Sequence, residues 1–441
     1  MKPILRFFLM ALMLAFFAGC SGWWGERQAP GLPGNRISIL PEQRPLPIGR
    51  IEEGLIRIPK PHRNLSWPQA GGFANHAMHH LAAPGSLTEI WSTSIGGGSN
   101  KYQQLVGSPV IIEEKIYTIN ADGVITELQA FTGKKSWTRR LKPLVGAGAE
   151  GTIGGGLAAS GNLLVATTGN GIVVCMDRRN GEVIWKKDIG IPIRSGPTIF
   201  DSQVIVLGIT NETYSFDKNN GSIMWRHSGS SEMTIFMGGS SPAASGSMVI
   251  VSHSSGELVA LGSKNGEQVW TESMVAARNS GPVSNISHSK GNPIIDRNLV
   301  IASSNSGRTI ASDLATGTRF WETNFGSSES LWVAGEYIYL VTTNRQLVCL
   351  ARRTGKLAWA TQLKTFENSR DKENPIEWTG PVLAGDRILV GGSNGEVWSA
   401  SPFSGKLLGK IRLSSAVYIS PVVADGIVYI LTDNARLYAF R

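Results

Sequence analysis

Residues 108–137 read SPVIIEEKIYTINADGVITELQAFTGKKSW. Short runs of β-branched and aromatic residues alternate in this stretch with Gly, Asn and Asp. Apolar runs separated by turn residues are typical of strands in an antiparallel meander. The stretch therefore predicts four successive strands, near residues 108–110, 115–119, 124–129 and 134–137.

The last element of this stretch, a turn with Gly followed by Trp, recurs along the chain about every forty-five residues. A recurring unit of this length indicates a repeat array. Four strands in each unit, repeated radially, describe a β-propeller blade. The element ends at Trp137, Trp185, Trp225, Trp270, Trp321 and Trp359, and in SGKLLG it ends at Gly409 instead.

The number of blades follows from the two ends of the array. A Trp-bearing strand without three preceding strands first appears at Trp91, and three strands without a fourth follow Gly409, near residues 418–422, 426–431 and 436–440. We therefore predict an all-β fold, an eight-bladed β-propeller over residues 67–441. Pairing of the N-terminal and C-terminal strands in one blade would remove the open edge that invites aggregation.

The repeated Trp has a structural interpretation, which we prefer to a ligand-binding one. At a fixed place on an outer strand, an indole ring can pack between neighbouring blades and bury a large aromatic surface. The Gly supplies a backbone conformation that needs a residue without Cβ. We expect the tryptophans to join blades.

The N-terminus has the features of a secretion signal. Lys2 and Arg6 precede an apolar run, residues 7–18, that is too short to cross a bilayer as a mature helix. The sequence Phe-Ala-Gly-Cys, which ends at Cys20, has the small residues of a lipoprotein cleavage site. We predict a signal peptide over residues 1–19 and lipidation of Cys20. A plain signal peptide with an incidental Cys is the alternative.

Residues 20–66 are rich in Pro and lack apolar periodicity, which predicts a semi-extended, flexible tether. The chain carries a formal charge of +9, and removal of Lys2 and Arg6 leaves +7. The sequence has no dense run of Lys and Arg, so we expect this mild excess of positive charge to be a generic surface charge. We expect no nucleic-acid partner.

Two groups of residues could carry chemistry. His76, His79 and His80 would share one face of a helix, but no Cys, Asp or Glu nearby in sequence completes a metal site. We expect an exposed or capping segment there and no metal. Cys175 and Cys349 occupy equivalent apolar strands of distant repeats, so we expect two buried thiols without a disulfide.

The repeats resemble those of pyrroloquinoline-quinone (PQQ) enzymes. Cleavage site, tether and propeller together resemble more specifically the BamB family, lipoproteins of the outer-membrane β-barrel assembly (BAM) machinery. The sequences that carry this resemblance are WPQAGGFANHAMHHL at 67–81, SLWVAGEYIYLVTTNRQLVCL at 330–350 and SPVVADGIVYILTDNARLYAFR at 420–441. The first and third are similar to alphaproteobacterial members.

The resemblance implies a scaffold without catalysis or cofactor. It implies a lipid-anchored protein on the periplasmic face of the outer membrane. Its partners would be the POTRA domains of BamA, the barrel-forming subunit, together with other BAM subunits, and unfolded outer-membrane proteins as further partners.

The resemblance also assigns the partner contact to two neighbouring loops. The first matches residues 233–242, and its candidate contact residues are Thr234, Ile235, Phe236 and Met237. The second matches residues 284–293, with His288 and Lys290 as candidates. Family members often have Leu and Arg where Phe236 and Met237 stand. They often have Asp where His288 stands, and some have a second acid where Lys290 stands. These differences preserve the apolar part of the contact and put its electrostatic part in question. Packing of Ile235 or Phe236 into the neighbouring blade is the alternative.

Two further functions remain open from the sequence. A quinoprotein dehydrogenase would need residues for its cofactor, but the chain has no adjacent cysteines and no acidic cluster suited to Ca²⁺. A generic propeller module that binds a peptide, glycan or other envelope partner is the second. The proteins that co-purify with the chain, and a quinone absorbance band, would discriminate among the three.

Overall fold

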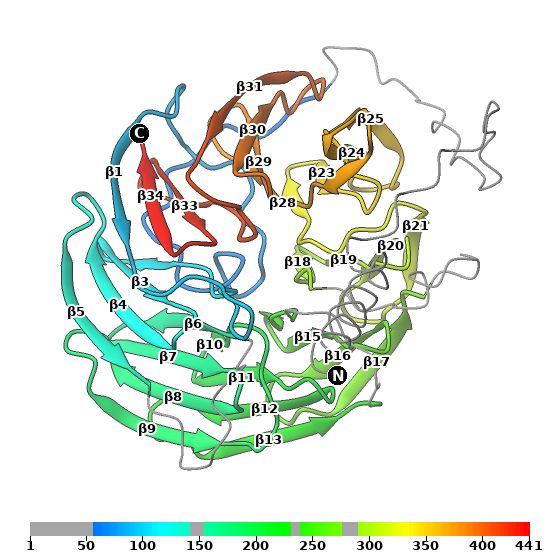
Figure 1. Cartoon of the computed structure of the whole chain (residues 1–441). Helices are drawn as coiled ribbons and strands as arrows, with labels where there is room; N and C mark the ends of the chain where they lie inside the picture. Colours follow the sequence, from blue (N-terminus) through cyan, green and yellow to red (C-terminus); the bar gives the residue numbers. More distant parts are fainter. Residues whose placement is uncertain (1–55, 142–153, 231–238, 276–289) are drawn as a thin grey trace, which may run out of the picture. The chain divides into compact units, whose positions relative to one another are not determined.

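The computed structural model describes residues 56–141, 154–230, 239–275 and 290–441. In these residues, eight four-stranded antiparallel sheets follow one another around a central axis, as Figure 1 shows. Within the same ranges, no helix has the length and apolar character needed to cross a membrane. The predicted all-β, eight-bladed propeller is confirmed.

Blades 1 to 4 each contain four consecutive strands, numbered from the axis outward. Blade 1 has β2 (Val110–Ile112), β3 (Lys115–Ile119), β4 (Val124–Gln129) and β5 (Lys135–Arg140), and blade 2 has β6 (Gly155–Ser160), β7 (Leu163–Thr168), β8 (Ile172–Asp177) and β9 (Val183–Asp188). Blade 3 has β10 (Thr198–Phe200), β11 (Gln203–Leu207), β12 (Glu212–Asp217) and β13 (Ile223–Ser228), and blade 4 has β14 (Ala243–Ser245), β15 (Met248–Ser252), β16 (Glu257–Gly262) and β17 (Gln268–Ser273).

Blades 5 to 7 repeat the same order. Blade 5 has β18 (Ile294–Asp296), β19 (Leu299–Ser303), β20 (Thr309–Asp313) and β21 (Arg319–Thr323), and blade 6 has β22 (Trp332–Ala334), β23 (Tyr337–Val341), β24 (Gln346–Ala351) and β25 (Leu357–Gln362). Blade 7 has β28 (Trp378–Leu383), β29 (Ile388–Gly392), β30 (Glu396–Ala400) and β31 (Leu407–Arg412). A hairpin of β26 (Phe366–Asn368) and β27 (Glu373–Pro375) connects blades 6 and 7.

The closing blade combines the two ends of the described chain. Its inner strands are β32 (Val422–Ala424), β33 (Ile427–Thr432) and β34 (Arg436–Phe440), and its outermost strand is β1 (Glu89–Ser94). Trp91 lies opposite Ala439 in the β1–β34 register. The predicted closure is confirmed.

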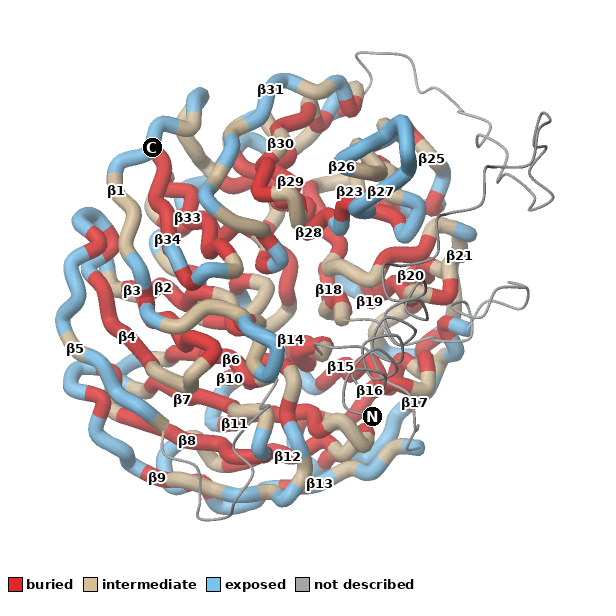
Figure 2. Tube along the Cα trace, in the orientation of Figure 1, coloured by how far each residue is buried: buried red, intermediate tan, exposed pale blue. Residues whose placement is uncertain are grey.

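Burial follows the strand order in each blade. The second and third strands are almost entirely buried, whereas the outermost strands are mostly exposed or half-buried outside the repeated Trp, as Figure 2 shows. Cys175 in β8 and Cys349 in β24 are buried, unbonded thiols, as predicted. Burial raises the pKa of the Cys175 thiol to about 12. Neither thiol is therefore suited to act as a nucleophile near neutral pH.

Each repeated Trp joins its own blade to the next one. Its indole N–H donates to the backbone oxygen at the start of the turn between the third and fourth strands of the following blade. The acceptors are Ala130 for Trp91 (3.0 Å), Arg178 for Trp137 (3.2 Å), Lys218 for Trp185 (2.9 Å), Ser263 for Trp225 (2.9 Å), Leu314 for Trp270 (3.0 Å), Arg352 for Trp321 (2.8 Å) and Pro402 for Trp359 (3.1 Å). The prediction that these residues join blades is confirmed.

The structure also explains why Gly409 replaces Trp in blade 7. The blade that follows it is the closing blade, where the third strand β34 ends near the C-terminus and the fourth strand β1 comes from the N-terminal part. No turn connects these two strands, so an indole ring at position 409 would lack the turn that the other tryptophans contact. A Cβ added at Gly409 would meet no atom within 4 Å.

A segment that we call the strap, residues 62–85, passes once around the inside of the ring. It forms a hydrogen bond with the innermost strand, or the turn that follows it, of every blade in succession. The bonded pairs are Asn64–Val423, Trp67–Ile111, Pro68–Ala159, Gln69–Ile199, Ala74–Ala244, Asn75–Ile295, His79–Trp332 and Leu81–Gly385. Innermost strands have one edge without a sheet partner, and the strap satisfies buried polar groups on that edge.

Residues 56–66, which we assigned to the tether from sequence, also lie against the propeller. Ile56 belongs to the largest hydrophobic cluster, and Asn64 is buried. The Pro59 ring lies beside Gly335, where an added Cβ would come within 2.8 Å of it. The predicted signal peptide and Cys20 lie outside the described residues.

Candidate functional site

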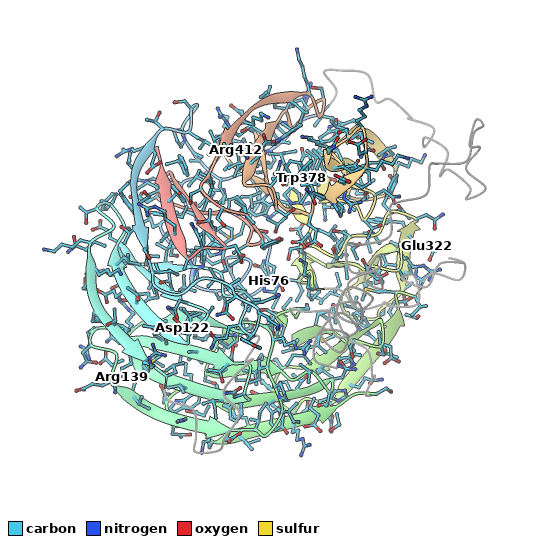
Figure 3. The ribbon with its side chains drawn as sticks, in the orientation of Figure 1. His76, Asp122, Arg139, Glu322, Trp378 and Arg412 are labelled. Atoms are coloured by element: carbon cyan, nitrogen blue, oxygen red, sulfur yellow. The ribbon has the colours of Figure 1, made fainter. Side chains whose placement is uncertain are left out.

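An axial cavity of about 840 Å³ lies at the centre of the ring. Its walls come from the links between blades and from the turns between second and third strands, and the strap supplies Trp67, Gly71 and His76. Figure 3 shows His76 near the centre of the ring. We call the end of the ring that carries these links and turns the link face.

The three clustered histidines belong to the strap and serve its packing. His76 and His80 are buried, so the expectation of an exposed segment is wrong for both residues. His76 Nδ1 lies 2.7 Å from Pro293 O, and His80 Nδ1 lies 2.7 Å from Pro59 O. Burial lowers the pKa of His76 to about 4, which keeps it neutral near neutral pH.

These histidines do not share a helix face. His76 and His79 have φ values of 59° and 53°, in the left-handed region, so the helical spacing that we considered is not realised. Among the described residues, no three His, Cys, Asp or Glu side chains gather as a metal site would require. His79 instead places Nε2 3.4 Å from Asp296 Oδ1.

Lys290, a predicted contact residue, lies in the wall of the axial cavity and is paired within the protein. Its Nζ atom is 2.6 Å from Glu329 Oε1, and Thr379 Oγ1 donates to the other Glu329 oxygen at 2.8 Å. The negative charge of Glu329 raises the pKa of Lys290, with further contributions from Glu377 and Tyr418. Lys290 therefore stays protonated and is held toward blade 6.

The two predicted contact loops begin and end on neighbouring blades. The first links β13 to β14 and the second links β17 to β18. Ser241, just after the first loop's contact residues, donates its backbone N–H to Asn292 Oδ1 at 2.8 Å. The described ends of the two segments thus meet on the link face. Thr234, Ile235, Phe236, Met237 and His288 lie outside the described residues.

Sequence reasoning missed two features of this region. Gln69 accepts a hydrogen bond from Ile199 N at 2.8 Å, and Asn292 connects blades 4 and 5. A buried amide that bonds to a distant backbone group leaves no periodic signal in the sequence. The available signal was that WPQAGGFANHAMHHL contains apolar residues without strand or helix periodicity, which suits a segment that bonds to other elements.

The propeller sequence matches the model of a known protein family. A family model described as "Outer membrane protein assembly factor BamB" matches residues 121–361 and 365–441. The protein of that name from Moranella endobia is 23% identical over 357 residues, which cover 80% of this chain and 89% of the relative.

Solved structures show the same architecture. BamB from Moraxella catarrhalis has a TM-score of 0.67 at 19% identity, covering 81% of this chain and 100% of that one. A quinohemoprotein alcohol dehydrogenase from Comamonas testosteroni has a TM-score of 0.68 at 13% identity, covering 86% of this chain and 81% of that one. At these identities the structural likeness shows the fold alone, and fold does not imply function.

Proposed function

Because the chain belongs to the family of the outer membrane protein assembly factor BamB, we propose that it is a non-catalytic scaffold for the assembly of outer-membrane β-barrel proteins. The match extends over most of the propeller. The buried thiols and the internally paired strap histidines give no group placed for catalysis. The family assignment, and not the fold, carries this proposal.

The finer proposal is that the link face at blades 3 to 5 binds a periplasmic POTRA domain of BamA. The observation that supports it is the hydrogen bond between Ser241 and Asn292, which holds together the described ends of the two segments proposed for contact. Two segments whose bonded residues are 51 positions apart in sequence can then act as one surface. Phe236 and Met237 would be its apolar anchors, since binding energy concentrates on a few large side chains.

The charge of this surface differs from the charge that the resemblance implies, which includes acidic residues. Lys290 stands at one of the acidic positions, and its ammonium group is bound to Glu329. Lys290 therefore offers the partner neither an acid nor an uncompensated cation. Binding would rest mainly on apolar contact in the first segment, and removal of the ion pair should affect affinity less than removal of Phe236.

The anchor and the tether would act through concentration. A lipid on Cys20 and the flexible segment that follows would keep the propeller near the periplasmic surface of the outer membrane, where BamA also lies. Tethering of this kind raises the effective concentration of a partner without adding contacts. Affinity for the isolated POTRA domain can then be modest.

The proposal is tested by affinity isolation of the full chain from detergent-solubilised envelope, followed by mass spectrometry. We expect recovery of BamA, and we expect Phe236→Ala with Met237→Ala to reduce it at least tenfold. The control is Phe403→Ala with Leu408→Ala, two exposed apolar residues of blade 7. Recovery of other envelope proteins without BamA would replace the scaffold by a generic binding module, and a quinone absorbance band would indicate an enzyme.

A further inference from the structure

The end of the ring opposite the link face, which we call the turn face, carries a turn between the third and fourth strands of blades 1 to 7. The second residue of each turn is exposed at its tip. In blades 1 and 7 this residue is Phe131 and Phe403, which are 42% and 39% exposed. In blades 2 to 6 it is Arg179, Asn219, Lys264, Ala315 and Arg353.

The ring holds both phenylalanines in place without needing them for its own packing. Trp91 donates to Ala130 O at 3.0 Å, and Trp359 donates to Pro402 O at 3.1 Å, so the residue before each Phe is fixed. The turns of other blades accept the same hydrogen bond with Asn or Ala at the tip. A large apolar side chain at these two tips is therefore not required by the fold.

Positive charge collects beside the same two turns. The residue after the turn Gly is Lys134 in blade 1, Lys356 in blade 6 and Lys406 in blade 7, whereas blades 2 and 4 have Glu182 and Glu267 there. Blades 6, 7 and 1 surround the closing blade, which lacks this turn, as Figure 1 shows. We call the turn face of blades 6, 7, 8 and 1 the docking sector.

The charge of the docking sector is not cancelled by its acids. Three acids on its inner turns already form ion pairs with arginines, in the pairs Glu113–Arg178, Glu336–Arg353 and Asp425–Arg63. The acids that remain there are Glu89, Glu114 and Asp386, and the cations are Lys134, Lys135, Lys356, Arg387 and Lys406. The sector is thus net positive, with exposed aromatic rings among the lysines.

The N-terminal segment reaches the propeller over this sector. The Pro59 ring lies beside Gly335 in the β22–β23 turn, and Arg63 pairs with Asp425 in the β32–β33 turn. Leu65, which follows Asn64 at the closing blade, is 66% exposed. The proposed lipid site at Cys20 lies 35 residues before Ile56. A flexible chain of that length spans about 30–35 Å on average, so the lipid would keep this sector close to a bilayer.

Exposed Phe and Leu with neighbouring Lys suit a lipid surface, because apolar side chains enter the interfacial region while lysines meet anionic headgroups. A flat bilayer can also contact turn tips of separate blades at once. We propose that the docking sector rests on an anionic lipid bilayer through Phe131 and Phe403. The inference rests on the proposed function, since the lipid on Cys20 supplies the membrane. The link face then points away from the bilayer and stays open to the protein partner.

The test uses the mature, lipidated full chain on vesicles of phosphatidylethanolamine and phosphatidylglycerol. Phe131→Cys carries the environment-sensitive dye NBD, and the buried Cys175 and Cys349 do not compete for it. The control is Ala315→Cys, the same turn position in blade 5. We expect at least twofold higher fluorescence at position 131, with quenching by lipids that carry a nitroxide on the acyl chain. Equal fluorescence and quenching at both positions would overturn the proposal.

The charge contribution has its own variants. Lys134→Glu with Lys406→Glu should reduce the quenching at position 131 at least twofold. Lys101→Glu with Lys264→Glu makes an equal change in charge at exposed lysines outside the sector and should leave it unchanged. Equal reduction by both pairs would refute a specific role of the sector's lysines.

Two outcomes separate this proposal from its alternatives. A probe that stays exposed to water on vesicles and becomes protected only when BamA is added would assign the sector to a protein and overturn the proposal. A chain that leaves the vesicles altogether would refute the lipid anchor, whereas a chain that stays with a water-exposed probe would refute only the docking. In detergent, which removes the bilayer, Phe131→Ala with Phe403→Ala should leave the recovery of BamA unchanged, and a tenfold loss would also assign the sector to protein.

Discussion

The indole nitrogen of Trp185 donates a hydrogen bond to the backbone oxygen of Lys218 at 2.9 Å, and its ring covers Gly221 in the same turn. One residue of blade 2 thereby fixes the position of a turn in blade 3. The same hydrogen bond is found at seven blade junctions, this one included. At each of these junctions, a Trp of one blade packs on a Gly in a turn of the next blade.

We expect Gly221→Ala to destabilise the protein by more than the backbone conformation alone explains. Gly221 has φ of +70°, and an added Cβ would lie 2.7 Å from the Trp185 ring. Gly426 also has φ of +70°, but an added Cβ there meets nothing within 4 Å. Gly426→Ala should cost about 1 kcal/mol, and Gly221→Ala at least about 2 kcal/mol more. Urea unfolding of the two variants measures the difference, and equal costs would refute the ring contact.

At Gly409 we expect a substitution by Ala to stabilise the protein and not to destabilise it. It occupies a strand, its backbone is not left-handed, and the space around it is open. Gly409→Ala should stabilise the protein by up to about 1 kcal/mol, because Gly weakens strand interiors. Gly405→Ala, with φ of +71° and an added Cβ 2.5 Å from Trp359, should destabilise it. Thermal unfolding of both variants measures the two changes in stability. Destabilisation at both positions would show that Gly409 itself contributes to stability.

The strap predicts that Gln69 is needed for stability. Replacement of Gln69 by Met keeps its length but removes the acceptor for Ile199 N, which leaves a buried N–H without a partner. We expect a loss of about 1–3 kcal/mol in the free energy of unfolding. Gln268→Met, on the exposed strand β17, should change it by less than about 0.5 kcal/mol. A similar small effect at both positions would mean that the strap contributes little to the ring.

Two buried histidines predict loss of stability in acid. Burial lowers the pKa values of His76 and His253 to about 4, and the positive charge of a neighbouring His227 also opposes protonation of His253. In the unfolded chain their pKa is about 6.5. As the pH falls from 6.5 to 4, the unfolded chain takes up protons that the folded protein does not, so stability decreases. Above pH 6.5 their contribution is complete.

The measurement is urea unfolding at pH 7.5 and pH 4.5. His76→Asn suits the site, because Asn tolerates the left-handed backbone and its amide can donate to Pro293 O. We expect the variant to lose less stability between the two pH values than the wild type, by about 1.4 kcal/mol for each pH unit over which His76 stays neutral when folded. An unchanged pH dependence would show that His76 is charged in the folded protein.

The sequence by itself determined the strand order, the blade count and the closure. Each depends on local information: turn residues, period-two apolar runs, and a Trp at a fixed distance from a Gly. It also identified Trp91 and the three C-terminal strands as parts of one blade, because incomplete repeats at both ends leave a single consistent pairing.

Only the tertiary structure decided the path of the strap, the burial of His76 and His80, the pairing of Lys290 with Glu329 and the junction of Ser241 with Asn292. These contacts join residues far apart in sequence, and they form because the ring brings the innermost strands and links of all blades together. Buried polar groups must find partners wherever the fold places them. Their partners therefore follow from the closed ring and not from any local pattern.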